Sequence, residues 1–130
     1  SYTHLAPFCL LAGGKEGLVL GQYVTLAYGV KLFSETDDYS GSSAVGSLMP
    51  EHLKKVKRVK TTIGALSILG ANSVVLPGCD LGEGVALGAC SLVTSSKQPW
   101  WIYIGSPARP YKPREKSVQK IFNQNQKSKN

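Results

Sequence analysis

A six-residue spacing of aliphatic side chains limits this chain to very few folds. From residue 63 to residue 93 an aliphatic side chain returns at every sixth position without interruption. The members of this series are Ile63, Leu69, Val75, Leu81, Leu87 and Val93. The same spacing occurs earlier, first between Leu5 and Leu11 and then through Leu20, Leu26 and Leu32. A repeat of this kind decides the architecture before any single helix or strand is considered.

The six-residue period excludes an α-helix, because 3.6 residues per turn would spread these side chains around the cylinder. It fits short strands, in which residues two and four positions apart share one face. Six residues then form one short side and a turn, and successive coils stack as parallel strands about 4.8 Å apart. The sequence therefore predicts an all-β fold, a parallel β-helix with aliphatic columns inside. We expect glycines, Asn72 and Asp80 at its corners, where φ is often positive.

The residues around each aliphatic position are small. Glycine follows four of the six aliphatic residues, as Gly64, Gly70, Gly82 and Gly88. The fourth position after the first five is occupied by Ser67, Ser73, Cys79, Val85 and Ser91. One coil cannot be stable alone, because burying its aliphatic residues contributes about 1.5–3 kcal/mol each, whereas ordering its backbone costs about 1–2 kcal/mol per residue. We therefore expect an oligomer or a well-capped stack.

The segment IGALSILGANSVVLPGCDLGEGVALGACSLVTSS and the ending WIYIGSPARPYKPR resemble the hexapeptide-repeat acyltransferases. Within that family the chain is most similar to sugar O-acetyltransferases of the galactoside, maltose and lipopolysaccharide type. The resemblance implies a left-handed β-helix of triangular section, assembled as a homotrimer with active sites between subunits. It also implies acetyl-CoA as the co-substrate and a small hydroxyl-bearing acceptor, such as a sugar. The handedness comes from the resemblance alone, since crossover connections are generally right-handed.

The repeat also defines the organisation of the chain. We expect a β-helix acyltransferase domain over residues 1–113, interrupted by an inserted loop at 34–62, and a C-terminal helix with a basic tail at 114–130. In the loop, the run KKVKRVK alternates cationic and apolar residues, as an edge strand does; its lysines are also suited to attract a cofactor's phosphates. Val118, Ile121 and Phe122 have the spacing of an amphipathic helix.

Acyl transfer to a hydroxyl needs a general base. The related sugar acetyltransferases use a histidine in the loop after the position of Leu32, but here Asp37 occupies that place and Asp38 follows it. Histidine is the usual base near neutral pH, and the chain has only His4 and His52. Adjacent carboxylates are another possibility, because the charge on one raises the pKa of the other. His4, Asp37, Asp38 and His52 therefore remain four candidate bases.

The remaining site residues follow from the resemblance. Tyr39 is placed to hydrogen-bond a sugar. The positions that match the family's coenzyme A groove are Ala71, Ala89, Thr94, Ser95, Arg109 and Lys112. Ser95 stands where a lysine is frequent, which weakens one phosphate contact. Arg109 and Lys112 keep the family's spacing and are suited to phosphate oxygens.

Charge and composition limit the alternatives. The net charge is +7, with five of the fifteen basic residues between Lys54 and Lys60. These segments lack interleaved aromatic residues, so we expect no nucleic-acid partner. Two histidines are too few for a three-histidine zinc centre, so we expect no metal. Three cysteines without CxxC spacing indicate the cytoplasm, and we expect neither a membrane span nor a secretion signal. A non-catalytic trimer that acts as a scaffold or binds carbohydrate remains the alternative function.

Overall fold

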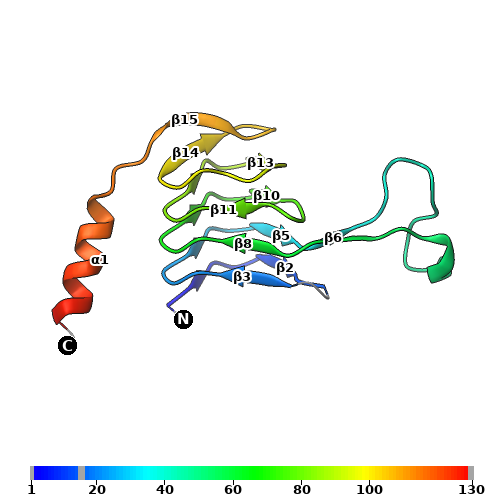
Figure 1. Cartoon of the computed structure of the whole chain (residues 1–130), viewed down its shortest axis with the longest axis horizontal. Helices are drawn as coiled ribbons and strands as arrows, with labels where there is room; N and C mark the ends of the chain where they lie inside the picture. Colours follow the sequence, from blue (N-terminus) through cyan, green and yellow to red (C-terminus); the bar gives the residue numbers. More distant parts are fainter. Residues whose placement is uncertain (1, 15–16, 129–130) are drawn as a thin grey trace.

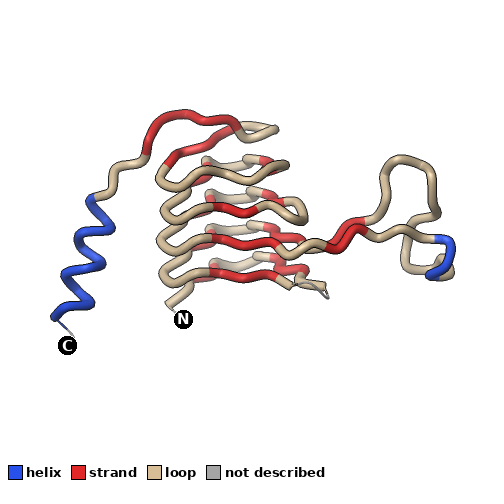
Figure 2. Tube along the Cα trace, viewed as in Figure 1, coloured by secondary structure: helices blue, strands red, loops and turns tan. Residues whose placement is uncertain are grey.

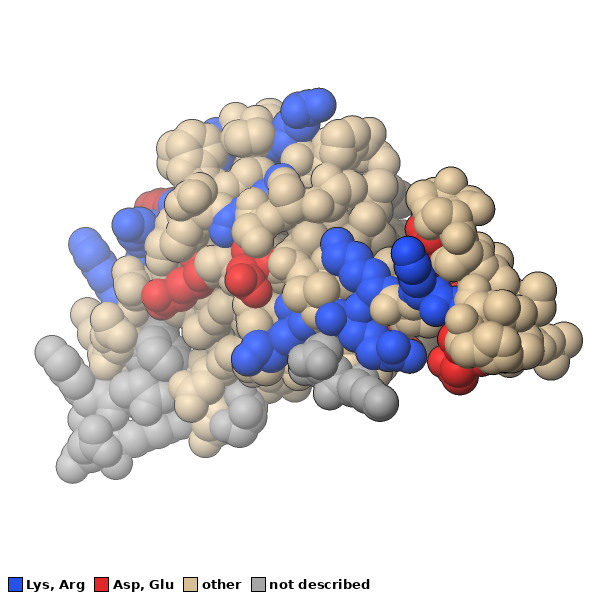
Figure 3. Space-filling model, turned by 45° about the vertical axis from the view of Figure 1, so that its right-hand side comes forward, with Lys and Arg blue, Asp and Glu red and all other residues tan. Residues whose placement is uncertain are grey.

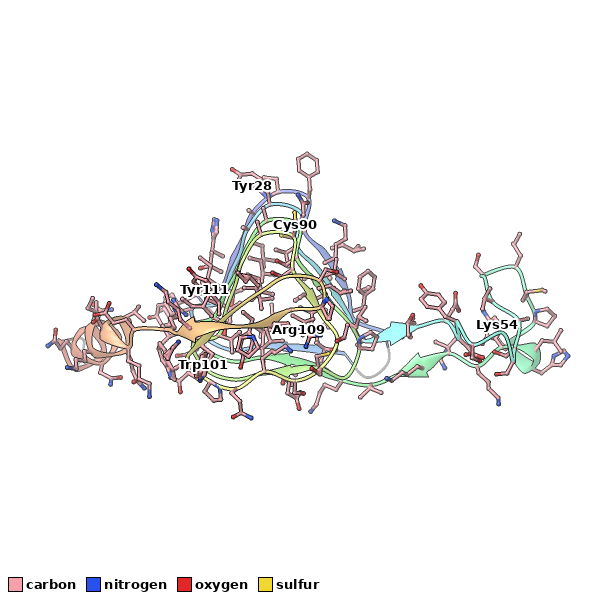
Figure 4. The ribbon with its side chains drawn as sticks, turned by 90° about the horizontal axis from the view of Figure 1, so that it is seen from above. Tyr28, Lys54, Cys90, Trp101, Arg109 and Tyr111 are labelled. Carbon is pink, nitrogen blue, oxygen red and sulfur yellow. The ribbon has the colours of Figure 1, made fainter. Side chains whose placement is uncertain are left out.

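The protein is a stack of coils with a triangular outline, seen from above in Figure 4 and from the side in Figure 1. The structure, a computed structural model, describes residues 2–14 and 17–128. Each coil contributes strands to three sheets, and strands from successive coils pair in parallel. Parallel stacking of short strands is what the six-residue period predicts, so the chain forms a parallel β-helix.

The three sheets of the prism are built as follows. The first sheet contains β1 (His4–Leu5), β4 (Thr25–Leu26), β9 (Ile68–Leu69), β12 (Ala86–Leu87), β14 (Trp101–Ile104) and β15 (Arg109–Pro113). The second contains β2 (Leu10–Ala12), β5 (Lys31–Phe33), β10 (Val74–Val75) and β13 (Leu92–Val93). The third contains β3 (Leu18–Leu20), β8 (Thr61–Ile63) and β11 (Asp80–Leu81). Figure 2 shows these short strands alternating with turns.

The predicted aliphatic columns form the core. All six members of the series from Ile63 to Val93 are buried, and Leu26 and Leu32 continue the columns below them. Leu5 and Leu11 of the lowest coil remain exposed because no strand of the described chain lies beneath them. The columns are therefore closed at the upper end and open at the lower end.

The glycines that follow the aliphatic residues serve a purpose different from the one expected. Gly64 and Gly70 do not have positive φ, whereas Leu66, Asn72 and Gly78, further into each turn, do. A Cβ on Gly70 would lie 2.7 Å from the backbone nitrogen of Ala89 in the next coil. These glycines allow two coils to approach closely. Asn72 occupies a positive-φ corner as predicted, but the prediction for Asp80 is wrong because Asp80 lies in strand β11.

The small residues four positions after the aliphatic ones connect neighbouring coils. The hydroxyl groups of Ser67 and Ser73 are buried and donate to the carbonyl oxygens of Gly82 and Gly88, at 3.3 and 3.1 Å. A buried hydroxyl must be hydrogen-bonded to be tolerated. The serine columns therefore meet this requirement by using carbonyl groups of the coil above.

The upper end of the stack is closed by a change of strand direction. Strand β15 runs antiparallel to β14, whereas β14 runs parallel to β12. The ring of Trp100 lies against Gly84, where an added Cβ would be 2.4 Å from a ring carbon. Arg114 lies over the Trp100 ring and donates from Nη1 to the carbonyl oxygens of Leu66 and Gly84, at 2.8 and 2.9 Å. Burial lowers the pKa of the Arg114 guanidinium below its ordinary value.

The inserted segment projects from the prism as an arm (Figure 1). Its neck is an antiparallel pair of β6 (Glu35–Thr36) and β7 (Lys57–Arg58), and its far end carries the 3₁₀-helix η1 (Glu51–Leu53). We refer to residues 34–60 as the arm. The strand in KKVKRVK is present, and it pairs with the outgoing strand of the same arm.

The C-terminal helix α1 (Ser117–Ser128) lies beside the prism (Figure 1). Val118 is half-buried and Ile121 is exposed, and both line a hollow shared with Leu66 and Ile68 of the prism. The side chain of Phe122 lies outside the described residues. The helix confirms the predicted element, although much of its apolar side remains open to solvent.

Candidate functional site

A pocket crosses three successive coils at one edge of the second sheet. Leu32 pairs with Val75 and Val75 pairs with Val93, so the residues that follow them, Phe33, Leu76 and Thr94, lie one above another. These three residues and Pro77 line a pocket of about 410 Å³. Its floor is apolar, and Thr94 contributes a hydroxyl at the top coil.

The arm supplies the polar wall of this pocket. Glu35, Thr36, Asp37, Tyr39 and Lys57 all line it. Asp37 and Tyr39 are therefore brought to the same pocket as Thr94, although 57 and 55 positions separate them in the sequence. The Tyr39 ring is 91% exposed, so its faces are free to contact a bound molecule. A carboxylate, a phenol and a hydroxyl around an apolar floor suit a polar acceptor and an acyl donor.

The neck of the arm is fastened to the coils by buried hydroxyl groups. Ser34 is fully buried, and its hydroxyl donates to the carbonyl oxygens of Ala12 and Gly13. Thr61 is also fully buried; its hydroxyl donates to the carbonyl oxygen of Phe33 at 2.7 Å and accepts from the N–H of Gly78 at 3.0 Å. These bonds fix the two points where the arm leaves and rejoins the prism. The first of them, Ser34, lies only three residues before Asp37.

The two adjacent aspartates have different surroundings. Asp38 accepts hydrogen bonds from the backbone of Ser40 and from the hydroxyl groups of Ser42 and Ser43, at 2.9, 2.9 and 2.7 Å. Hydrogen bonds from the side chains of Ser40 and Ser43, with further bonds from the Ser40 backbone and Ser42, hold the pKa of Asp38 well below its ordinary value. Of the two adjacent aspartates, Asp38 is therefore not the one whose pKa is raised. Asp38 closes a turn, and Asp37 remains the aspartate that faces the pocket with Thr94.

The histidines lie elsewhere within the protomer. His4 is exposed on β1, in the lowest coil and in the first sheet, where it pairs with Thr25. His52 is exposed in η1 at the far end of the arm, where Figure 4 shows its neighbour Lys54. Neither histidine lines the pocket of Asp37 and Thr94. One protomer thus brings together Asp37, Tyr39 and Thr94 and leaves both histidines apart.

The predicted coenzyme residues flank one sheet. Ala71 and Ala89 occupy the corner before β10 and β13, where the N–H of Cys90 donates to the carbonyl oxygen of Ala71 at 2.8 Å. Thr94 and Ser95 are exposed at the opposite end of β13. The two pairs therefore border the second sheet on both sides. In Figure 4 Cys90 marks the first corner.

The top of the prism carries the predicted phosphate ligands and one residue that the sequence analysis missed. Arg109 and Lys112 are exposed on β15, and Figure 4 shows Arg109 over the top coil. Lys97 places its Nζ 3.2 Å from the hydroxyl of Ser95 and 3.2 Å from the carbonyl oxygen of Ala108. A lysine ammonium thus reaches Ser95, where the family pattern has a lysine. The signal in the sequence was Lys97 itself, which lies only two positions after Ser95.

The rest of the described chain offers few other chemistries. Residues 2–14 and 17–128 contain no group of three or more His, Cys, Asp or Glu side chains placed to hold a metal ion. Over the same residues, no helix has the length and apolarity needed to cross a membrane. The three cysteines are free thiols, with Cys79 buried. Burial raises the pKa of the Cys79 thiol above its ordinary value.

Comparison with known proteins identifies the family. The chain superposes on AntD, an N-acyltransferase from Bacillus cereus whose solved structure contains dTDP-4-amino-4,6-dideoxyglucose and coenzyme A, with a TM-score of 0.95. The two sequences are 35% identical, over 98% of this chain and 69% of that one. The chain belongs to the hexapeptide-repeat acyltransferase family.

Two further proteins are similar to this chain. The dTDP-4-amino-4,6-dideoxy-D-glucose acyltransferase of Escherichia coli is 28% identical over 120 residues, which are 92% of this chain and 62% of that protein. A maltose O-acetyltransferase structure from Clostridium difficile 630 shares the fold, with a TM-score of 0.64 and 20% identity over 88% of this chain and 60% of that one. A scan against protein-family models finds no match. The chain spans less than two thirds of the length of the Escherichia coli relative.

Proposed function

We propose that this chain transfers an acyl group from acyl-coenzyme A to a sugar, at a site that contains Asp37. The observation that carries the proposal is the pocket in which Asp37 and Tyr39 of the arm meet Thr94 of the top coil. The proposal is supported by the AntD likeness, because that N-acyltransferase was crystallised with coenzyme A and an amino sugar nucleotide. Acetyl-CoA is the simplest acyl donor that fits.

The acceptor group we propose is an amine on a sugar linked to a nucleoside diphosphate. Both AntD and the Escherichia coli relative are named for 4-amino-4,6-dideoxyglucose carried on dTDP. An amine has a sizeable neutral fraction near pH 8, so it needs less help from a base than a hydroxyl does. Among the described residues the pocket is lined by two carboxylates, Glu35 and Asp37, and by no histidine, which fits the amine better. A sugar hydroxyl is the second candidate acceptor.

The residues have distinct roles in this proposal. Acyl-CoA supplies a thioester, whose carbonyl carbon bonds to the acceptor nitrogen while its carbon–sulfur bond breaks. Asp37 takes the proton that the nitrogen loses, and that proton leaves with the released thiol. Tyr39 contacts the sugar with its exposed ring and hydroxyl. Phe33 and Leu76 exclude water from the floor of the pocket.

The coenzyme lies along the second sheet in this proposal. Ala71 and Ala89 would contact it through backbone groups, and Thr94 would lie close to the thioester. Ser95 together with Lys97 would contact a phosphate, because the Lys97 ammonium lies at the Ser95 hydroxyl. These five positions are exposed or half-buried, as ligand-binding residues must be. The phosphate ligands at the top of the prism are Arg109 and Lys112.

We propose the finer features of the fold and assembly on the same grounds. The β-helix is left-handed and the active unit is a homotrimer, as the family resemblance implies. An exposed apolar tip on the arm, at Leu48 and Leu53, supports a contact between copies of the chain. Light scattering should give three times the chain mass of 13.9 kDa. The free thiols support a reducing compartment, the cytoplasm.

The test of the function is release of free thiol. The purified chain is mixed with acetyl-CoA and either dTDP-4-amino-4,6-dideoxyglucose or a panel of simple glycosides. We expect thiol release with the amino sugar nucleotide. The proposal fails if no acceptor yields thiol and coenzyme A does not bind. Carbohydrate binding without thiol release would instead favour the non-catalytic trimer, a scaffold or carbohydrate-binding protein.

A further inference from the structure

The basic residues of the arm fall into two kinds. Lys54 forms an ion pair with Glu51 at 3.2 Å and also donates to the carbonyl oxygen of Gly46 at 3.2 Å. Arg58 forms an ion pair with Glu35 at 3.3 Å. Both charges are balanced within the arm. The function proposed above gives no role to the other basic residues of the arm, which carry a large part of the net charge.

Lys55 and Lys57 face the functional site. Both line a hollow of about 410 Å³ on the arm, together with Asp37 and Tyr39. Lys57 also lines the neighbouring pocket that contains Thr94. Val56 between them lines the same hollow, so this short segment forms one of its walls.

The charges of Lys55 and Lys57 are not balanced by an ion pair. Within the described part of the chain, no carboxylate lies at ion-pair distance from either lysine. Asp37 and Asp38 also line the hollow, and the Asp38 carboxylate accepts hydrogen bonds from the serines of its turn instead of pairing with a lysine. Figure 3 shows Lys and Arg side chains gathered where the arm joins the prism. The hollow therefore combines two lysines outside any ion pair with two carboxylates and with the hydroxyls of Thr36 and Ser42.

We propose that Lys55 and Lys57 bind a pyrophosphate group, that of the nucleotide-linked acceptor. Residues two positions apart are separated by at most about 7 Å along the backbone, so the two ammonium groups can each reach one phosphate of a diphosphate. Lysine binds phosphate as a point charge with three donors. The exposed Tyr39 ring adjoins the hollow and offers a face for the sugar or the base. This inference rests on the proposed function, because it places the sugar beside Asp37.

Coenzyme A also contains a pyrophosphate, so the experiment must separate the two sources. The binding of dTDP and of coenzyme A is measured separately by calorimetry, for the full chain and for its variants. The test variants are Lys55→Met, Lys57→Met and the double variant, in which methionine keeps the chain length and removes the charge. Lys60→Met is the matched control, because Lys60 is exposed on the same segment and lines neither pocket.

We expect the dissociation constant for dTDP to rise about tenfold for each lysine removed, as loss of a charged hydrogen bond predicts. Coenzyme A binding and the Lys60→Met variant should stay unchanged, and the difference should shrink at high salt. Weaker coenzyme A binding alone would overturn the assignment to the acceptor, because the lysines would then bind the pyrophosphate of the coenzyme. Unchanged binding of both ligands to a folded double variant would overturn the proposal.

The same measurements distinguish the site from the reaction. If the full chain binds dTDP through these lysines but releases no thiol, the proposed reaction is contradicted and the pyrophosphate site stands. If thiol is released and the double variant keeps its KM for the amino sugar nucleotide, the site is contradicted and the reaction stands. Far-UV circular dichroism of each variant confirms that the coils are intact.

Discussion

Thr61 donates its hydroxyl proton to the carbonyl oxygen of Phe33 across 2.7 Å, although 28 positions separate the two residues. This bond joins the residue before the arm to the residue after it, so the arm begins and ends at one point. The arm can therefore be long without disturbing the stacking of β5 on β10. The position of Asp37 depends on this closure.

Thr61→Val should destabilise the protein by about 1–3 kcal/mol, because the carbonyl of Phe33 and the N–H of Gly78 lose their partner. Urea unfolding measures the change. Thr62→Val is the matched control: Thr62 lies on the same strand but bonds Asp80 near the surface, and its loss should cost about 0.5 kcal/mol or less. Equal losses of unfolding free energy in the two variants would show that the bond from Thr61 to Phe33 contributes no more to stability than a surface bond does.

Gly70→Ala should also destabilise the stack, by about 1–3 kcal/mol, because the new methyl group meets the backbone of the next coil. Gly13→Ala is the control, since its Cβ would have no contact closer than 3.9 Å. Thermal unfolding compares the two variants. A neutral Gly70→Ala would mean that the coils can separate slightly without cost.

Asp37→Asn should lower kcat by about 10²-fold to 10⁴-fold, the usual contribution of a positioned base. The KM for acetyl-CoA should change little, because Asp37 is not among the residues that hold the coenzyme in the proposal. Steady-state thiol release measures both constants. Full activity in Asp37→Asn, together with loss of activity in His4→Ala or His52→Ala, would move the base to a histidine.

Asp38 should titrate below its ordinary pKa of 3.8, because hydrogen bonds from Ser40, Ser42 and Ser43 stabilise the carboxylate in the folded protein. Its contribution to stability is therefore present above pH 3.8 and is lost as the pH falls through the lower, folded-state pKa. Carbon-13 NMR of the side-chain carboxyl group measures this titration. Replacing Ser42 and Ser43 with alanine should raise the pKa towards 3.8, and an unchanged value would contradict the assignment to these bonds.

Cys79 should react with iodoacetamide far more slowly than Cys90, because Cys79 is buried and its thiol pKa is raised, whereas Cys90 is exposed. Mass spectrometry of peptides after timed labelling gives both rates. Labelling in 8 M urea is the control, since the two thiols should then react alike. Similar rates in the native protein would show that the column around Cys79 opens readily.

The core could be predicted from the sequence because a strict period allows only one way to bury its members. Each aliphatic residue from Ile63 to Val93 occupies the same place on one side of a coil, three to a coil, so one correct assignment determines all six. The corners were harder, because glycine serves both positive φ and close approach. Only the structure shows that Gly70 serves the second purpose and Gly78 the first.

The residues of the candidate site could be predicted from the sequence, but their arrangement in space could not. The arm contained Asp37 and Tyr39, and the top coil contained Thr94, but their meeting depends on the path of an irregular segment. The difference between Asp37 and Asp38 comes from serines two to five positions further on, whose orientation no periodicity predicts. Lys97 was missed because the family pattern was applied position by position, whereas a long side chain reaches beyond its own position.

The pocket spans three coils: Phe33 comes from the coil that carries the arm, Leu76 and Pro77 from the next coil, and Thr94 from the last coil of this sheet. The number of coils therefore sets how far Asp37 lies from Thr94, and in the proposed function how far it lies from the thioester. Duplicating residues 68–85 would add one complete rung with every side chain in register. It would also lift Thr94 by roughly 4.8 Å, and a well-folded protein would then hold its two substrates too far apart to react.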